Sequence, residues 1–171
     1  LGAVTANGKV AVRDAVVGAT TWEAIKFQAD IDGSVTISGC VVTSSSATTN
    51  VLRFSGDLNG PVAISKTVVV GAFYGVYLEK PRALVSFTDV AITGGALGVG
   101  LKINAMLAAT IIFSGSITGV KRGIALPAVD SASTVTISGA TVAGFDERGI
   151  ATDTTTGIVS GTINIVDSFV A

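Results

Sequence analysis

A ten-residue phrase occurs seven times in this chain, and its recurrence restricts the possible fold more than any other feature. The starts of successive copies lie 25, 27, 23, 26, 24 and 28 residues apart. The copies are KVAVRDAVVG from Lys9, SVTISGCVVT from Ser34, PVAISKTVVV from Pro61, LVSFTDVAIT from Leu84, TIIFSGSITG from Thr110, TVTISGATVA from Thr134 and TINIVDSFVA from Thr162. A pattern that repeats at such a period is typical of a solenoid, in which each period forms one coil.

Apolar residues fill the second and fourth positions of every copy, and mostly small or polar residues stand between them. The second position holds Val10, Val35, Val62, Val85, Ile111, Val135 and Ile163, and the fourth holds Val12, Ile37, Ile64, Phe87, Phe113, Ile137 and Ile165. An alternation with a period of two predicts a strand with one buried face. We therefore expect the residue between each apolar pair to point outward.

A second apolar motif follows each phrase except the last by about half a period. It reads AIKF from Ala24, VLRF from Val51, GVYL from Gly75, GVGL from Gly98, GIAL from Gly123 and GIAT from Gly149. Two apolar residues again flank one variable residue. The variable column is Lys26, Arg53, Tyr77, Gly100, Ala125 and Ala151, and we expect it to face solvent.

Two or three short strands cannot bury their apolar faces within one period, but stacked coils can do so when each strand pairs in parallel with its counterpart above and below. An antiparallel sandwich would not repeat one phrase at a fixed period. Alternating βαβ units would need amphipathic stretches of ten or more residues, which the chain lacks. We expect an all-β fold, a right-handed single-stranded parallel β-helix of about six to seven coils with about 25 residues per coil, as one domain over residues 1–171.

The phrase and the period resemble the right-handed parallel β-helices of the pectate-lyase-like superfamily. The resemblance covers residues 9–171 and rests on V-x-I-S-G followed about ten residues later by G-I-x-L, as in TVTISG from Thr134 and RGIA from Arg148. That superfamily includes polysaccharide lyases, tailspike proteins of tailed bacteriophages and some adhesins. The resemblance implies the fold, while enzymes, receptor binders and spacers all share it.

Composition excludes several classes of function. The chain has no histidine and one cysteine, which leaves too few ligands for a zinc site and no Ser-His or Cys-His pair. The formal charge is −1, and no basic patch predicts a nucleic-acid partner or attraction to an anionic membrane. We expect no cofactor, and we expect Cys40 to pack as a small apolar group.

Only 13% of the residues are charged, about half the share of an ordinary soluble domain. Outward columns of Ala, Thr, Ser and Gly then predict that some faces are covered by other copies of the chain. We expect a homo-oligomer, and the resemblance to tailspikes favours a homotrimer. Neither end of the sequence contains a capping helix, which predicts that residues 1–171 are a section of a longer polypeptide.

The twelve acidic residues are scattered, so the sequence contains no complete catalytic constellation and no metal site. Asp14, Asp89 and Asp167 share one column of the phrase, but they lie three coils apart and are interpreted as turn residues. The nearest catalytic candidates are Asp146 and Glu147, in the polar turn FDERGI.

Tyr74 and Tyr77, with Glu79 and Arg82, form the best candidate for carbohydrate binding. A tyrosine ring can stack on a sugar while the charged groups bind its hydroxyls. Arg148, in the FDERGI turn, completes the carbohydrate-binding candidates. Trp22 is expected to close one end of the core.

These observations leave three hypotheses. The first is a structural and receptor-binding segment of a phage tailspike or tail fibre, located in the virion tail or outside the cell, which presents a rigid face to bacterial surface polysaccharide. The second is part of a pectate-lyase-like polysaccharide lyase or glycoside hydrolase. The third is a spacer segment of a secreted bacterial adhesin. Sparse charge and the expected self-association favour the first.

Overall fold

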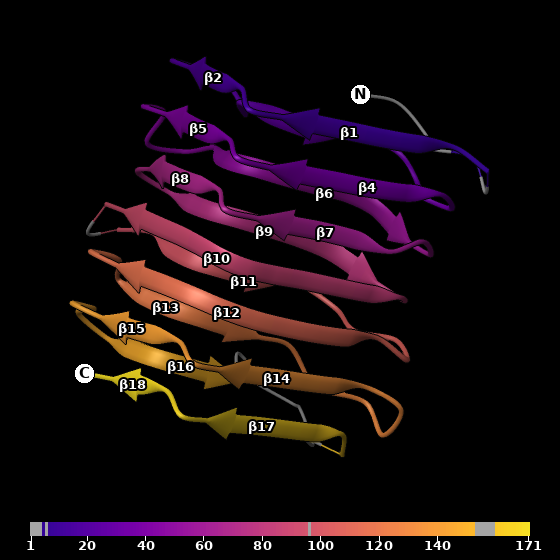
Figure 1. Ribbon diagram of the computed structural model, residues 1–171. Coiled ribbons are helices and arrows are strands. Elements are labelled where there is room, and N and C mark those ends of the chain that lie inside the picture. The colour runs from indigo at the N-terminus through magenta and orange to yellow at the C-terminus, as the bar shows by residue number, and fades with distance from the viewer. Residues whose placement is uncertain (1–4, 6, 96, 153–159) are drawn as a thin grey trace.

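The chain folds as a right-handed parallel β-solenoid of about six turns with about 25 residues per turn. The computed structural model describes residues 5, 7–95, 97–152 and 160–171. Figure 1 shows the strands of successive coils stacked like rungs, with the described N-terminal residues at one end of the stack and the C-terminus at the other. The predicted fold class is therefore confirmed.

Three columns of strands run along the stack. Two of them belong to one sheet, which we call sheet B, and the third forms sheet A. The first column contains β1 (Lys9–Arg13), β4 (Ser34–Ser38), β7 (Val62–Ser65), β10 (Leu84–Gly94), β12 (Thr110–Thr118), β14 (Thr134–Ser138) and β17 (Thr162–Val166). The second column contains β2 (Val16–Ala19), β5 (Val41–Ser44), β8 (Val68–Gly71), the later parts of β10 and β12, β15 (Thr141–Ala143) and β18 (Phe169–Val170). Sheet A contains β3 (Ile25–Phe27), β6 (Asn50–Leu58), β9 (Tyr74–Pro81), β11 (Val99–Ile103), β13 (Arg122–Leu126) and β16 (Arg148–Thr152).

The seven phrases pair in the predicted register. Val35 lies opposite Val62, Val62 opposite Val85, and Val85 opposite Ile111, all in parallel strands. Like side chains therefore stack on like, and the apolar ladders fill the interior. In the central coils these residues are almost completely buried, as with Val85 at 0% exposure.

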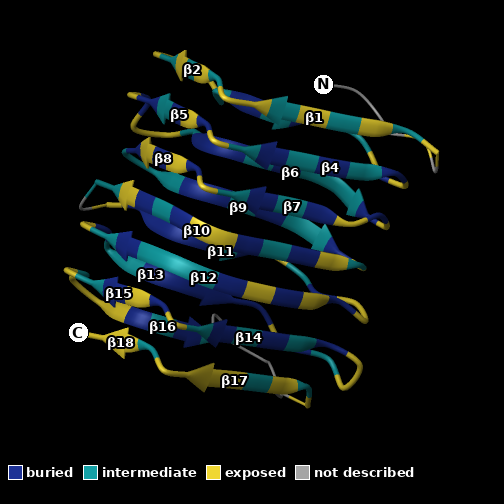
Figure 2. Ribbon diagram, in the orientation of Figure 1, coloured by how far each residue is buried: buried dark blue, intermediate teal, exposed yellow. Residues whose placement is uncertain are grey.

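The first and last coils are less well covered than the middle of the stack, as the colours of Figure 2 show. Val10 and Val12 on β1 are half-buried, whereas their counterparts Val35 and Ile37 on β4 are buried. Ile165 on β17 is 51% exposed. Among the described residues these coils have a neighbouring coil on one side only, so their apolar side chains are covered from that side alone.

The sixth position of the phrase makes the bend between the two columns of sheet B. Asp14, Asp89 and Asp167 all have positive φ there, with values of 49°, 54° and 49°. Gly39, Gly115 and Gly139 hold the same position in three other copies and also have positive φ. Aspartate and glycine tolerate the left-handed region better than most residues. The three aspartates are thus turn residues, as predicted.

One predicted column needs correction. We expected Gly100 to align with Tyr77 and face solvent, but Lys102 pairs with Tyr77, and Leu101 pairs with Val76. The apolar residues of β11 alternate through both registers, so a shift by two residues leaves the same face buried. In the observed register Gly100 is buried, and an added Cβ would lie 2.3 Å from Ile117 Cγ2.

The two single-residue expectations for packing have opposite outcomes. Cys40 is buried at 1% exposure and its sulfur lies 3.2 Å from the Ser38 carbonyl oxygen, which confirms its structural role. The expectation for Trp22 is wrong. Its side chain is 72% exposed, because it lies in the connection before β3 and the stacked rings of Phe27 and Phe54 fill the core there.

Candidate functional site

The outer face of sheet A carries a column of polar and aromatic side chains on four successive coils. Lys26, Arg53, Tyr77 and Lys102 occupy matching positions on β3, β6, β9 and β11. The column continues in register to Ala125 and Ala151, which were expected to face solvent, but both are buried. The accessible part of this column therefore ends at Lys102.

A hollow of about 320 Å³ lies over β6, β9 and β11 on this face. We call it the tyrosine hollow, and it is lined by Thr48, Asn50, Arg53, Phe73, Tyr74, Tyr77, Lys102 and Asn104. The Tyr74 and Tyr77 ring centroids are 5.8 Å apart with 31° between the ring planes, and Phe73 packs on Tyr74 at 4.2 Å. The hollow thus has an aromatic wall with polar groups around it.

Glu79 lies beside the hollow and fixes two of its lining residues. The Tyr77 hydroxyl donates a hydrogen bond to Glu79 Oε2 at 2.8 Å, and Asn104 Nδ2 donates to Oε1 at 2.7 Å. Burial first, and then the hydrogen bond to the Glu79 carboxylate and its negative charge, raise the pKa of Tyr77 to about 12. Tyr77 therefore keeps its proton at neutral pH, and Glu79 orients the ring.

Arg53 is held from behind by a second carboxylate. Its Nη1 lies 3.1 Å from Glu23 Oε1, and its guanidinium carbon lies 5.5 Å from the centroid of the Tyr77 ring, within range of a cation–π contact. Burial raises the pKa of Glu23, but hydrogen bonds from its own backbone and from Arg53, with the charges of Lys26 and Arg53, outweigh burial and lower it. Glu23 is thus an ionised anchor for Arg53.

Buried polar atoms without a hydrogen-bond partner gather at the start of β6. Asn50 is only 6% exposed, yet its Oδ1 has no partner, and Arg53 Nε is also buried and unpartnered. Thr49 Oγ1 and Ser55 Oγ, before and after these residues in the chain, are also buried and have no hydrogen-bond partner. An unpaired buried polar group costs about 1–3 kcal/mol. Two of these four atoms belong to residues that line the tyrosine hollow.

Arg82 lies apart from the other carbohydrate-binding candidates on β9. Its Nε is 2.7 Å from Asp57 Oδ2, and Lys80 lies 3.4 Å from the other oxygen of the same carboxylate. Burial raises the pKa of Asp57, but the hydrogen bonds and charges of Arg82 and Lys80 lower it overall. Arg82 therefore belongs to an ion pair at the end of the strand and does not line the tyrosine hollow.

The turn with Asp146, Glu147 and Arg148 is exposed and lies on other coils. Glu147 contacts Lys121 at 2.9 Å, and Arg148 is in register with Arg122. The side-chain hydrogen bond from Lys121 lowers the pKa of Glu147, with further lowering by neighbouring positive charges. A general acid for glycoside hydrolysis needs a raised pKa, so this carboxylate is suited to an ion pair rather than to that role.

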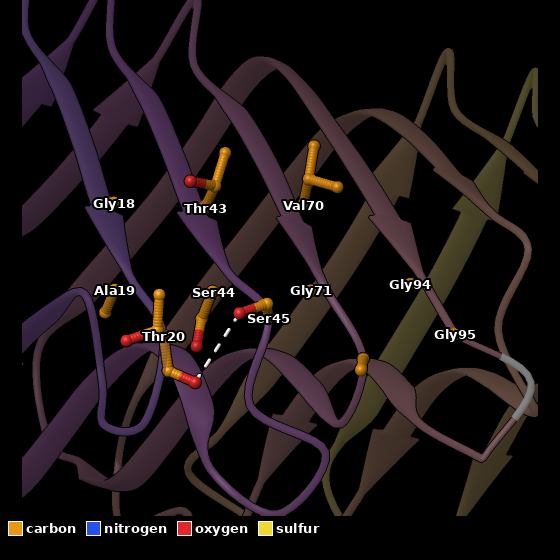
Figure 3. A pocket seen from close by; sticks show the side chains of 11 residues that line it. Gly18, Ala19, Thr20, Thr43, Ser44, Ser45, Val70, Gly71, Gly94 and Gly95 are labelled. Atoms are coloured by element: carbon orange, nitrogen blue, oxygen red, sulfur yellow. Dashed lines mark hydrogen bonds between the residues drawn. The ribbon is translucent and has the colours of Figure 1, made fainter.

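A larger hollow of about 840 Å³ lies where β2, β5, β8 and β10 end, as Figure 3 shows. It is lined by Gly, Ala, Ser, Thr and Val alone. Its serine hydroxyls already have partners, since Ser44 Oγ donates to the Trp22 carbonyl at 3.1 Å and Ser45 Oγ to the Thr20 carbonyl at 3.5 Å. This hollow has no charged side chain that could orient a ligand.

The second column of sheet B carries exposed valines on three successive coils. Val16 pairs with Val41, and Val41 with Val68, while Ala91 follows on the next coil. The valines are 83%, 37% and 39% exposed. We call this row the valine ladder. Aliphatic side chains in an exposed row form a surface that another apolar surface could cover.

The motifs of the sequence predicted two lining residues of the hollow, Tyr74 and Tyr77, as binding residues. The other lining residues were not predicted as such, and they are Thr48, Asn50, Arg53, Phe73, Lys102 and Asn104. Asn104 and Lys102 lie one coil beyond Glu79 and Tyr77, so the correct register of β11 would have found both. Asn50 pairs with Tyr74 across the sheet. No pattern in the sequence indicates that its side-chain oxygen is buried without a partner.

Within the described ranges, no group of three or more acidic or cysteine side chains could hold a metal ion. The same part of the chain contains no helix long and apolar enough to cross a membrane. Comparisons of the chain with protein families, with curated proteins and with solved structures found no match.

Proposed function

We propose that this β-solenoid is a structural and receptor-binding segment, of the kind found in phage tailspikes or tail fibres, that binds bacterial surface polysaccharide through the tyrosine hollow. The observation that carries the proposal is the aromatic wall of Tyr74 and Tyr77 beside buried polar atoms that lack partners. Sugar rings present apolar faces and polar edges, and this combination of surfaces complements both.

The backbone of the hollow supports this function. β6, β9 and β11 are central strands of sheet A, and each pairs with strands on both sides. A ligand would therefore meet a site that is already formed and would lose little free energy to ordering of the protein. Glu79 and Glu23 hold Tyr77, Asn104 and Arg53 in place before any ligand arrives.

The test is to measure binding of the purified chain to an array of bacterial capsular and lipopolysaccharide glycans, neutral and acidic. We expect Tyr77→Ala to weaken binding by about tenfold or more, because the stacking surface is lost. Thr36→Ala, on the first column of sheet B and outside the valine ladder, is the control and should bind as the unchanged protein does. If no glycan binds, or if Tyr77→Ala binds equally well, the proposal is wrong.

The same incubation examines the enzymatic alternative. New reducing ends or unsaturated sugars that disappear in Asp146→Asn or Glu147→Gln would favour a lyase or hydrolase. We expect neither product, since Glu147 is paired with Lys121 and exposed. A spacer of an adhesin would bind no glycan at all.

Self-association is the second part of the proposal. The valine ladder is an uncharged, aliphatic surface on a chain with few charges, and a second copy would cover it most simply by packing the same ladder or an adjacent small-residue surface against it. A trimer is the arrangement that the resemblance to tailspikes implies. This interface lies on sheet B and leaves the tyrosine hollow accessible.

A further inference from the structure

The tyrosine hollow is lined by cations and contains no carboxylate in its lining. Arg53 and Lys102 contribute positive charge on neighbouring coils, on either side of Tyr77 in the column. The two nearby carboxylates, Glu79 and Glu23, already accept hydrogen bonds from residues of the hollow. The charged side chains in the lining are therefore both positive, and Glu79 keeps its negative charge beside them because its partners Tyr77 and Asn104 are neutral.

The unpartnered atoms of β6 indicate which hydrogen-bonding groups a ligand would need beside its charge. Arg53 Nε is a donor on a guanidinium, and it requires an acceptor. Asn50 Oδ1 is an acceptor on a side chain that is 6% exposed, and it requires a donor. A hydrogen bond from a guanidinium to an anionic oxygen is roughly twice as strong as one between neutral groups. An anionic group next to a hydroxyl would supply the acceptor and the donor that these two buried atoms lack, once the two side chains turn toward the hollow.

We propose that the sugar bound on Tyr74 and Tyr77 carries an anionic substituent, a carboxylate or a phosphate, which Arg53 and Lys102 bind while Asn50 Oδ1 accepts a hydrogen bond from an adjacent sugar hydroxyl. This inference rests on the proposed function and specifies its ligand. Asn50, Arg53 and Lys102 then determine which glycans the aromatic wall retains.

Three matched probes test the proposal by calorimetry or NMR titration of the full chain. They are a glucuronic-acid oligosaccharide, its carboxyl-reduced neutral counterpart, and that neutral counterpart after phosphorylation. We expect at least one anionic probe to bind about tenfold more tightly than the neutral one, because charge-assisted hydrogen bonds replace neutral ones. The preference should shrink as salt is raised, since the hollow is open to solvent.

Variants assign the effect to the hollow. Lys102→Gln should reduce the preference for the anionic probe, and Lys80→Gln, which makes the same change of charge beside Asp57, should leave it unchanged. Arg53→Gln alone would leave Glu23 with only the longer 3.9 Å ion pair to Lys26, so it is combined with Glu23→Gln to keep the net charge of the cluster unchanged. The double variant should also reduce the preference for the anionic probes, and only the part that Lys102 supplies should remain.

The outcomes separate this inference from the function on which it rests. Equal binding of neutral and anionic probes, lost in Tyr77→Ala, would overturn the anionic substituent and leave carbohydrate binding intact. Binding of only the carboxylate or only the phosphate probe supports the inference and identifies the source of the charge. Loss of the preference in Lys80→Gln as well would show a general charge effect and overturn the assignment. If neither these probes nor the glycan array bind, the proposed function itself is wrong.

Discussion

Two outer faces of this solenoid rest on one interior but differ in chemistry. Over sheet A, successive coils present Lys26, Arg53, Tyr77 and Lys102, with ion pairs and an aromatic wall. Over the second column of sheet B, the corresponding positions form the valine ladder, and the neighbouring hollow is lined by small residues. β8 alternates strictly between exposed and buried residues, whereas β6 alternates only around Arg53.

The difference shows that the inward residues restrict the outward ones very little. An inward residue must stack on its counterparts in the coils above and below, so only aliphatic and aromatic residues serve there. An outward residue meets solvent and one or two neighbours along the column. One face can therefore carry a ligand site while another carries an apolar surface, without any change in the coil.

The largest expected effect is a loss of stability when part of the interior shared by both faces is removed. Phe54 is fully buried and stacks on Phe27 with ring centroids 4.8 Å apart. Phe54→Ala should lower the free energy of unfolding by about 3–5 kcal/mol, because it leaves a cavity beneath Arg53. Chemical denaturation followed by circular dichroism measures this change.

Phe169→Ala is the matched control for that substitution. Phe169 lies on β18 and is 60% exposed, so its removal should change the free energy of unfolding by no more than about 0.5 kcal/mol. Similar losses for the two variants would contradict the stacked interior as the source of stability.

The next largest expected effect is a loss of self-association, caused by a substitution on the sheet B face. Val68→Lys places a charge in the valine ladder, and we expect self-association to weaken by about tenfold or more because that charge would be buried between copies. Light scattering across a range of protein concentrations measures the change. Glycan binding at the tyrosine hollow should remain.

Thr36→Lys adds the same charge on the first column of sheet B and should not alter association. A chain that is monomeric at all concentrations before any substitution would rule out the valine ladder as an interface. Equal effects of Val68→Lys and Thr36→Lys would place the interface elsewhere on sheet B.

The smallest expected effect is the loss of stability when the Tyr77 hydroxyl on the sheet A face is removed. Tyr77→Phe keeps the ring but removes the hydrogen bond to Glu79, which should cost about 1 kcal/mol at neutral pH. In the unchanged protein the pKa of Tyr77 is raised from 10.0 to about 12. The protonated form is therefore favoured by folding, and its contribution is complete below pH 10 and is lost as the pH rises through about 12.

Urea unfolding across this alkaline range measures the loss of stability. The ultraviolet absorbance of tyrosinate measures the ionisation of Tyr77. The part of the pH dependence due to Tyr77 should be missing in Tyr77→Phe. Tyr74→Phe is the control, because it also removes a tyrosine hydroxyl but leaves the hydrogen bond from Tyr77 to Glu79 in place. If both variants keep the full alkaline dependence, Tyr77 is not its source.

The repeat in the sequence predicted the columns of sheet B residue by residue. Val35, Val62 and Val85 stack as expected, because each phrase offers a single register that keeps both apolar positions inward. The prediction failed at β11, where Val99, Leu101 and Ile103 fit two registers equally well. The register depends on contacts between coils, such as the close approach of Gly100 to Ile117, which the pattern within β11 does not describe.

The candidate site was predicted in part for the same reason. Tyr74, Tyr77 and Glu79 lie on one strand, so their proximity follows from the chain itself. Arg82 is as close in sequence, yet it turns to Asp57 on the preceding coil. Asn50 and Asn104 join the tyrosines from coils on either side, and their positions depend on contacts between coils.

The sequence by itself determined the solenoid, because a period of about 25 residues with alternating apolar positions can bury its side chains only by stacking one coil on the next. The tertiary structure alone decided which outward side chains meet, which carboxylates are used by internal ion pairs, and which buried polar atoms lack partners. Those properties depend on the register and spacing between coils, and a difference of two residues in register exchanges a glycine for a lysine at the edge of the tyrosine hollow.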